Sequence, residues 1–493
     1  MWECLLGQKN RECLDPCSFR TEKALEVNLS DGWSRATPLF DDERLVSSVG
    51  LVPVMALAEQ AGLSELVAEQ VRLGSARVAS AGVNPAGKVS SIIAGMAAGA
   101  DSIDDLQVIR SGGMKLLFSE VYAPATLGQF LREFTHGHTL QLASVARAHL
   151  VNLVERTDLL PGIETQAYVD IDSLLRPIYG HAKQGASFGH TKIAGKQVLR
   201  KGLSPLATTI STGDSAPVVA GIRLRAGKAG SGKGAASMVR EAIKTARAAG
   251  ATGEILLRGD SAYGNSAVVA ACVKANARFS LVLTKNPAVS AAIGSIPAHA
   301  WTPVRYPGAV LDPDTGELIS DAEVAEVEFT AFASTKHPVT ARLVVRRVRD
   351  QAKLDELFPV WRYHPFFTNS TEPTVQADLT HRRHAIIETT FADLIDGPLA
   401  HMPSGRFASN GAWTICAMIT HNLLRAAATL SPGRLAVARG ATLRRQIIHV
   451  PARLARPQRR PVLHLPAHWP WAEKWLAIWN GVFEQPLAPP AAA

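Results

Sequence analysis

Three acidic residues, Asp172, Asp260 and Glu388, have the settings of metal ligands. Asp172 and Asp260 each end an apolar run with strand character, and Glu388 follows a basic cluster in a stretch with helical periodicity. Carboxylates gathered from two strands and a helix can hold two Mg²⁺ ions about 3.5–4 Å apart, and Mn²⁺ can substitute. Such a pair of ions activates water or a hydroxyl for attack on a phosphodiester. The pattern therefore predicts metal-dependent chemistry on DNA strands.

Asp170 is a fourth candidate ligand, because side chains alternate along a strand and Asp170 shares a face with Asp172. Two carboxylates on one buried face repel each other unless a cation lies between them. We expect Asp172 to bind the metal and Asp170 to support it from nearby. The alternative is that one of the two pairs with a neighbouring arginine.

The C-terminal part of the chain is rich in arginine. No Asp or Glu occurs between Asp396 and Glu473, whereas ten arginines do. Guanidinium groups suit phosphate oxygens in shape and charge, so we expect this stretch to hold a DNA backbone. The alternative is a solvated basic tail. The expected phosphate-binding residues in the densest part are Arg444, Arg445, Arg453, Arg456, Arg459 and Arg460.

Residues 227–233 satisfy the G-x4-G-K pattern of a phosphate-binding P-loop and lie between an expected strand and an expected helix. Gly234, however, replaces the Ser or Thr that would bind Mg²⁺. A P-loop ATPase is therefore the weakest reading. We expect a flexible basic loop that contacts DNA through Lys228 and Lys233.

The elements that must position the acids follow an α/β order. Three antiparallel strands, then helix, strand, helix and strand, is the order of an RNase H-like fold, and a later helix returns Glu388 to the sheet. Strands are predicted at 166–172, 205–211, 217–225, 254–259 and 279–284, and helices at 235–248, at 265–275 and from about 379.

The predicted fold is thus an RNase H-like α/β core with an inserted β-rich subdomain and helical flanks. The 42–160 helices fit a reader of DNA ends, and equally an ordinary helical bundle. The predicted parts are a poorly ordered segment 1–41, a helical DNA-binding region 42–160, the first part of the core 161–285, the insertion 286–375, the second part of the core 376–430, and a basic C-terminal region 431–493 with a Pro/Ala-rich tail.

Composition fits a protein with a polyanionic partner. The 493 residues carry a net charge of +9, with a pI of about 9.4, and 47% are apolar. The five cysteines form no zinc pattern, although Cys13 and Cys17 are closely spaced, and this sparse set favours a reducing cytosol. No uninterrupted apolar run reaches about 18 residues. We expect a cytoplasmic, nucleoid-associated protein without a membrane partner.

Several short motifs occur in an order that resembles one family. They are 170–173, 179–180, 183–189, 258–261, 381–388, 416–425 and 450–466. Together they are similar to DDE transposases of bacterial insertion sequences, and more narrowly to those with the group-one DDE domain, the thirteen-eighty insertion-sequence family. The resemblance covers nearly all of residues 40–480.

The resemblance implies an activity. It makes Asp172, Asp260 and Glu388 the DDE triad of an enzyme that binds the terminal inverted repeats of its element, cleaves DNA with two Mg²⁺ ions, and transfers the ends to target DNA. Because both ends must be cut together, it also implies at least a homodimer on double-stranded DNA.

The chain departs from the family pattern Y-x2-R-x3-E-x6-K. His381 and His384 replace the tyrosine and the arginine, and Ile395 replaces the lysine. An apolar residue cannot contact phosphate, so either this copy is impaired or Arg406 supplies the charge. Arg382 and Arg383 are expected to hold end phosphates, being adjacent to the arginine position.

Trp361 precedes the catalytic helix, where related hairpin-forming transposases place an aromatic residue that holds a flipped base. A buried strand tryptophan is the alternative, and we favour it slightly. Two rival functions remain open. One is a catalytically inactive DNA-binding protein derived from a transposase, and the other is an RNase H-like nuclease without strand transfer.

Overall fold

The computed structural model describes residues 33–74, 80–180, 182–193, 196–230, 232–304, 310–311, 318–319, 322–349 and 360–483. The chain divides into two units, 1–42 and 43–493, and the second contains the described helices and sheets from β1 onwards. Cys13, Cys17, most of the segment 1–41 and the Pro/Ala-rich end lie outside the described residues.

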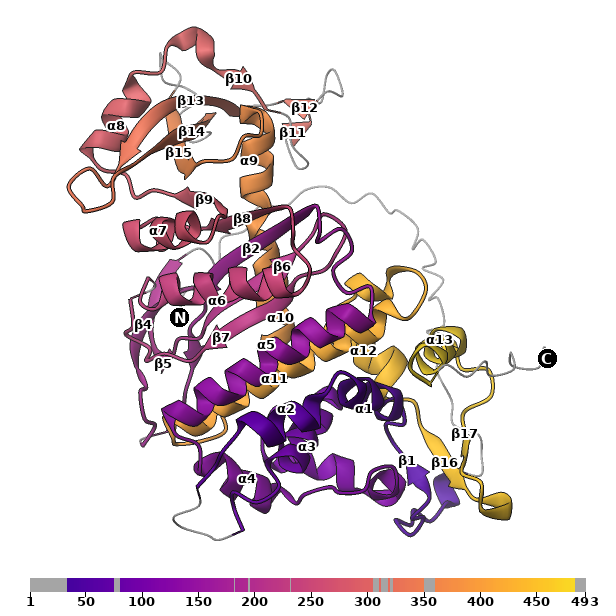
Figure 1. The fold of residues 1–493 in the computed structure, drawn as a ribbon. Helices are drawn as coiled ribbons and strands as arrows, with labels where there is room; N and C mark the ends of the chain where they lie inside the picture. Colours follow the sequence, from indigo (N-terminus) through magenta and orange to yellow (C-terminus); the bar gives the residue numbers. More distant parts are fainter. Residues whose placement is uncertain are drawn as a thin grey trace, which may run out of the picture. The chain divides into compact units, whose positions relative to one another are not determined.

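Nine strands of the second unit form one mixed sheet (Figure 1). In chain order they are β2 (Gln166–Ser173), β6 (Leu206–Ser211), β7 (Val218–Arg223), β8 (Glu254–Gly259), β9 (Arg278–Val282), β10 (Thr302–Pro303), β13 (Ala322–Ala331), β14 (Val339–Arg349) and β15 (Trp361–Thr368). Their order across the sheet is β10-β13-β14-β15-β9-β8-β2-β6-β7.

The half of the sheet from β9 to β7 contains the elements predicted from the sequence. Strands β2, β6 and β7 are antiparallel neighbours, and β8 and β9 run parallel to β2. Helix α6 (Ala235–Ala248) connects β7 to β8, and helix α7 (Ser266–Lys274) connects β8 to β9. Each predicted strand and connecting helix is confirmed to within a few residues.

The strands of the inserted region continue this sheet. β13, β14 and β15 form an antiparallel set, and β15 pairs with β9 through Phe366, Phe367 and Thr368. Phe367 is fully buried and contacts the ring of Phe279 on β9, with centroids 5.3 Å apart. The insertion therefore extends the sheet that carries the acidic residues.

The chain segment that connects β2 to β6 forms a three-stranded sheet that was not predicted from the sequence. Its strands are β3 (Arg176–Pro177), β4 (Ser187–Ile193) and β5 (Lys196–Leu203), in the order β3-β5-β4. Glycine is frequent in this stretch, which reads as loop in sequence. The structure instead uses some of these glycines for close approach between backbones.

Helices dominate residues 51–156, as predicted. They are α1 (Leu51–Gln60), α2 (Leu63–Gln70), α3 (Pro85–Ala97), α4 (Pro124–Arg132) and α5 (His136–Arg156). A bent pair, α1 with α2, passes a length and composition test for a membrane span, whereas no single described helix does.

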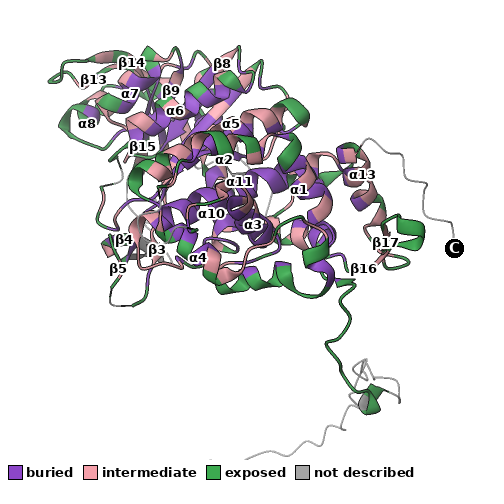
Figure 2. Ribbon diagram, turned by 60° about the horizontal axis from the view of Figure 1, so that its bottom comes forward, coloured by how far each residue is buried: buried purple, intermediate pink, exposed green. Residues whose placement is uncertain are grey.

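A later helix, α11 (Phe407–Thr429), runs through the core, and α5 lies alongside it (Figure 1). Every residue of α11 from Ser409 to Ala428 is buried, so the helix is covered on all sides (Figure 2). A helix that is buried on every face organises the interior instead of covering a surface.

Helix α11 also covers the outer edge of the sheet. The side-chain amide of Asn422 donates to the carbonyl of Val219 on β7 and accepts from its backbone N–H, both at 2.8 Å. The edge strand would otherwise leave these backbone groups unpaired. One buried side chain therefore performs the hydrogen bonding of a missing neighbouring strand.

The C-terminal region packs back onto the N-terminal helices. β16 (Ala452–Ala455) pairs with β1 (Leu45–Val46) and with β17 (Val462–His464), and α13 (Ala472–Phe483) packs against α1. The alternative that the arginine-rich stretch between Asp396 and Glu473 is a solvated basic tail is therefore wrong.

Candidate active site

Asp172 lies near the end of β2 in an electrostatic environment dominated by other acids. Burial raises the pKa of its carboxyl to about 7, and the backbone N–H of Ser173, which donates at 2.6 Å, opposes this rise. The negative charges of Asp260 and Glu388 raise the pKa further. The structure thus brings the three predicted acids close enough for their charges to interact.

The pairing of β2 with β8 explains how two of these acids meet. The parallel register places Ile171 opposite Gly259, so Asp172 and Asp260 follow at the carboxyl ends of neighbouring strands. A Cβ atom at Gly259 would lie 3.0 Å from Cγ2 of Ile171, so only glycine fits without displacement. Asp260 is exposed, and one of its oxygens accepts from the N–H of Ala262 at 2.9 Å.

Asp170 takes part in a different interaction. Its two oxygens accept hydrogen bonds from Nε and one terminal nitrogen of Arg258, at 2.7 and 2.8 Å, and both side chains are almost completely buried. The other terminal nitrogen of Arg258 donates to the carbonyl of Thr380 at 3.0 Å. Asp170 is therefore the acid that pairs with an arginine, and both of its carboxylate oxygens are engaged by Arg258.

Glu388 is carried by a helix that is interrupted just before it. Helix α9 (Thr374–Arg382) passes into a 3-10 segment (Arg383–Ile386), and α10 (Ile387–Ile395) then begins. Glu388 lies in the first turn of α10 and is exposed, as are Arg382 and Arg383. The prediction of a helix from about residue 379 misses the interruption, which separates the two basic residues from Glu388.

His381, at the tyrosine position of the family pattern, is a core residue. Its ring is stacked on Phe366, with centroids 4.2 Å apart and planes at 2°, and its Nδ1 lies 2.9 Å from Oγ of Ser280. Burial lowers the pKa of His381 to about 3, so its imidazole is neutral. His384 is half-buried, and its Nδ1 lies 2.7 Å from the carbonyl oxygen of His381.

The acidic cluster fits a divalent cation by its chemistry. Among the described residues, no group of three or more His, Cys, Asp or Glu side chains is arranged closely enough to hold a metal ion. The donors are nevertheless carboxylate oxygens, which Mg²⁺ prefers. The raised pKa of Asp172 reflects first the burial of its carboxyl and then the negative charges of Asp260 and Glu388, and a cation would stabilise the ionised form against both. Binding requires Asp172, Asp260 and Glu388 to approach one another further.

An open hollow of about 800 Å³ lies beside Asp260, lined in part by Ser261, Lys285, Trp361 and His384. It combines basic and aromatic side chains next to the acidic cluster. Its size and lining suit part of a nucleotide better than a small ion.

Trp361, on this lining, is half-buried at the start of β15. The guanidinium of Arg347 lies over its ring at 4.4 Å and over the ring of Trp301 at 4.2 Å. Trp361 is therefore neither a fully buried strand residue nor an aromatic ring with two open faces.

The loop 227–233 does not have the arrangement of a P-loop. The buried guanidinium of Arg225 donates to the carbonyl oxygens of Gly230 and Lys233, at 3.3 and 3.0 Å. A P-loop directs backbone N–H groups at phosphate, whereas these carbonyls point towards a cation. Lys228 and Lys233 are exposed.

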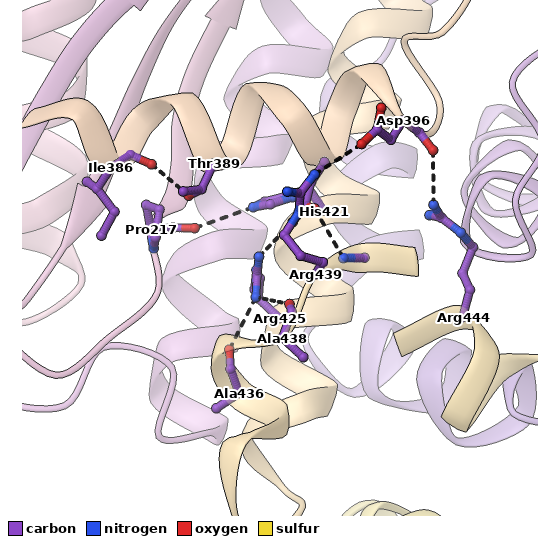
Figure 3. A network of polar contacts seen from close by, with 12 residues as sticks. Pro217, Ile386, Thr389, Asp396, His421, Arg425, Ala436, Ala438, Arg439 and Arg444 are labelled. Atoms are coloured by element: carbon purple, nitrogen blue, oxygen red, sulfur yellow. Dashed lines mark hydrogen bonds and ion pairs between the residues drawn. The ribbon is translucent and has the colours of Figure 1, made fainter. Parts of the chain in front are cut away.

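The predicted arginines differ in their contacts and in their exposure. Arg406 donates to the carbonyl of Arg132 at 3.0 Å, and Arg445 lies over the ring of Trp471 at 5.5 Å. The half-buried Arg444 donates to the backbone carbonyl of Asp396 at 3.3 Å (Figure 3). Arg445 is nevertheless exposed, as are Arg453, Arg456, Arg459 and Arg460.

A polar network at the end of α10 has no counterpart in the sequence predictions. The buried carboxylate of Asp393 accepts from Arg425 on α11 at 2.7 Å, from the N–H of Gly440 at 3.2 Å, and from Arg439. Arg439 also donates to the carboxylate of Asp396 at 3.1 Å (Figure 3). The network holds the C-terminal end of the Glu388 helix against α11 and the residues that follow it.

Three comparisons with known proteins differ in what they find. A comparison with curated proteins found no match. One similar solved structure is the cryo-EM structure of the piggyBac transposase synaptic complex with hairpin DNA. Its identity is 11%, its TM-score is 0.36, and the match covers 78% of this chain and 72% of that chain. A TM-score this low does not establish that the two proteins share a fold.

The family comparison covers almost the whole chain. Residues 34–484 match the family described as transposase DDE domain group 1, a span that includes Asp172, Asp260 and Glu388. The chain therefore belongs to the transposase DDE domain group 1 family.

Proposed function

We propose that this transposase binds the terminal inverted repeats of its own element, cleaves the DNA there with two Mg²⁺ ions, and joins the freed ends to target DNA. The observation that carries the proposal is the electrostatic coupling of Asp172 with Asp260 and Glu388 in a chain of the DDE family. Membership of the narrower thirteen-eighty insertion-sequence family stays a prediction.

The strand order supports an RNase H-like core. Strands β7, β6 and β2 are antiparallel, β8 and β9 continue parallel to β2, and helices α6 and α7 make the crossovers. This is the arrangement inferred from the sequence for 161–285. The region 286–375 is then an insertion that adds strands beyond β9, and 376–430 completes the core with the Glu388 helix.

The chain's own residues set up the reaction. Asp172 and Asp260 hold the cations, and Glu388 completes the second site. Bound Mg²⁺ supplies activation of water or a 3′-hydroxyl and neutralises charge on the scissile phosphate. The ion pair between Arg258 and Asp170 joins β2 to β8, and this connection fixes the spacing of Asp172 and Asp260. The proton of Asp172, whose pKa is about 7, is released to solvent before a cation binds.

DNA contacts follow from exposure and charge. Arg382 and Arg383 lie exposed ahead of Glu388 and are placed to bind end phosphates. The region 42–160 reads the repeat, and Trp361 offers a stacking surface beside the hollow. Two copies act together on DNA because both ends are processed. Further phosphate contacts are assigned to Lys228, Lys233, Arg453, Arg456, Arg459 and Arg460.

Ile395 favours a second candidate function, a DNA-binding relic without activity. This residue ends α10, is half-buried and packs against the core, so it gives phosphate no charged partner. Arg406, the possible substitute, already donates to the carbonyl of Arg132. A nuclease without strand transfer is the remaining alternative.

A cleavage experiment separates these functions. A labelled duplex that carries the element's end is incubated with Mg²⁺ and the wild type, Asp260→Asn or Asp214→Asn, the last being an exposed aspartate in the β6–β7 turn. The proposal expects cleavage at the repeat boundary by the wild type and Asp214→Asn alone, with joined products once target DNA is added. Binding without cleavage by the wild type identifies the relic, and cleavage without joining identifies the nuclease.

A further inference from the structure

The ribbon formed by β4 and β5 lies in a stretch of the chain without acidic residues. No Asp or Glu occurs from Ser173 to Gly213. The same stretch contains six lysines and arginines, which are Arg176, Lys183, Lys192, Lys196, Arg200 and Lys201. Within the ribbon, side chains are described for residues 187–190 and 198–201.

One face of the ribbon combines cationic and apolar side chains. Phe188 is paired with Lys201 and His190 with Leu199, and opposite residues of paired strands share a face. All four are exposed, Phe188 by 65% and Leu199 by 58%. Arg200 is exposed on the other face. Large apolar side chains among cations are costly in water and indicate a surface that is covered in use.

Close backbone packing fixes the base of the ribbon. The N–H of Gly227 donates to the carbonyl of Gly185 at 3.3 Å, and the N–H of Lys228 donates to Oγ of Ser187 at 2.8 Å. A Cβ atom at Gly227 would lie 2.1 Å from the carbonyl oxygen of Ser187 and 2.4 Å from that of Gly202. The glycine of the apparent P-loop therefore allows the loop to dock on the face of the ribbon that carries Ser187 and Arg200, and this docking places the exposed Lys228 on that face, opposite Phe188 and Leu199.

The ribbon is also tied to the acidic cluster. Arg176 on β3 is four residues after Asp172, so its Cα lies at most about 14 Å away, four steps of about 3.6 Å. Arg176 donates to the carbonyl of Ala400 at 2.8 Å, and the N–H of Gln184 donates to that of Gly405 at 2.9 Å. The ribbon is thereby anchored to the loop that follows the Glu388 helix.

We infer that the β4–β5 ribbon, with Lys228 beside it, is a contact surface for duplex DNA. With the ribbon inserted in a groove, Arg200 and Lys228 bind phosphates from one face and Lys201 from the other, where Phe188 and Leu199 lie against the groove. This inference rests on the proposed function. A duplex fits better than a second copy of the chain, because two such cationic faces repel each other. A two-stranded ribbon also has the width of a DNA major groove. Since phosphates carry the affinity, binding is independent of sequence.

The test compares two charge-matched variants of the full chain. Arg200→Ala/Lys201→Ala removes one arginine and one lysine from the ribbon, and Arg240→Ala/Lys244→Ala removes the same pair from the exposed face of α6. Binding to a fluorescent 40-base-pair duplex of unrelated sequence is measured by anisotropy at several salt concentrations. Each lost phosphate contact lowers the slope of log K against log salt by about 0.9. For the ribbon variant, the slope of log K against log salt should fall by about 1.8, and the affinity at 100 mM salt should fall roughly tenfold or more. The α6 variant should keep the slope and the affinity of the wild type.

Phe188→Ala is the third variant. Because an apolar contact releases no counterions, it should weaken binding severalfold with an unchanged salt slope. Thermal unfolding of every variant checks that the fold is retained. Wild-type affinity and slope in the ribbon variant would overturn the inference, as would a change confined to self-association in sedimentation. Failure of the wild type to bind any duplex would overturn the proposed function instead.

Discussion

Asp170 and Arg258 form a buried, two-pronged ion pair that joins the two strands from which Asp172 and Asp260 emerge. The pair gives neighbouring acids on one strand different tasks. Asp170 is neutralised by a guanidinium, whereas Asp172 faces other carboxylates. One acid therefore stabilises the sheet, and the other is available for a cation.

Substitution of the two acids should have opposite effects on stability. Asp170→Ala leaves Arg258 buried without its partner, which we expect to cost about 3–5 kcal/mol of unfolding free energy. Asp172→Asn removes a charge that is buried and repelled by Asp260 and Glu388, so the stability of the variant at pH 8 should equal or exceed that of the wild type, while cleavage is lost. Urea unfolding and cleavage of the same preparations check both statements. Equal destabilisation by the two changes would contradict this division of tasks.

The raised pKa of Asp172 predicts a pH dependence. The folded state binds the Asp172 proton more tightly than the unfolded state, whose pKa is about 4. The stabilising contribution is therefore fully present below about pH 4 and is lost as the pH rises to about 7. Buried histidines with lowered pKa values, such as His149 and His381, act in the opposite direction.

The measurement is thus the difference in melting temperature between the wild type and Asp172→Asn, followed from pH 5 to pH 8 without metal. The wild type should lose stability relative to the variant across this range. Mg²⁺ should restore it at pH 8 more than at pH 6, because protons compete for the same oxygens. A difference that does not change with pH would argue against the raised pKa.

Tyr263 should act through Asp172. The side chain of Tyr263 is buried, and its hydroxyl lowers the pKa of Asp172. Within the described residues, this hydroxyl has no partner that satisfies hydrogen-bond geometry. Removing an unsatisfied buried hydroxyl costs little stability. Tyr263→Phe should therefore unfold at the wild-type urea concentration or above it, yet require more Mg²⁺ for half-maximal cleavage. Unchanged Mg²⁺ dependence would limit Tyr263 to packing.

The Asp393 network should support the Glu388 helix from its other end. Asp393→Ala leaves Arg425 buried and partly unpaired, at an expected cost of about 3–5 kcal/mol. Arg439→Ala removes a half-exposed partner and should cost less than about 1 kcal/mol. Urea unfolding of the two single variants and of the double variant measures the coupling. A larger loss of unfolding free energy for Arg439→Ala than for Asp393→Ala would contradict the central role assigned to Asp393.

The sequence allowed the strands β2 and β8 and the two aspartates at their ends to be predicted, because each depends on a local apolar run. It did not separate Asp170 from Asp172, since the period-two pattern places both on one face. The choice is made by the parallel register, which sets Arg258 opposite Asp170. Register between strands that are distant in sequence is not a local property.

Close contacts between backbones explain why the β3-β5-β4 sheet and the return of the C-terminal region to α1 were not predicted from the sequence. Gly189, Gly202 and Gly227 look like loop residues, yet each lies where a side chain would collide with a neighbouring backbone. At Gly50, an added Cβ would lie 1.8 Å from the carbonyl oxygen of Ile447, where the arginine-rich region returns to α1. Such positions reveal their role only once the partner backbone is known.

The amide of Asn422 on the edge of β7 has a consequence for solubility. Open strand edges invite neighbouring molecules to add strands, and this is a common route to fibrous aggregates. At β7 the Val219 backbone is already paired, and at the other end the short β10 contains Pro303, which has no N–H to offer. Both ends of the nine-stranded sheet are thereby protected from strand addition by other molecules.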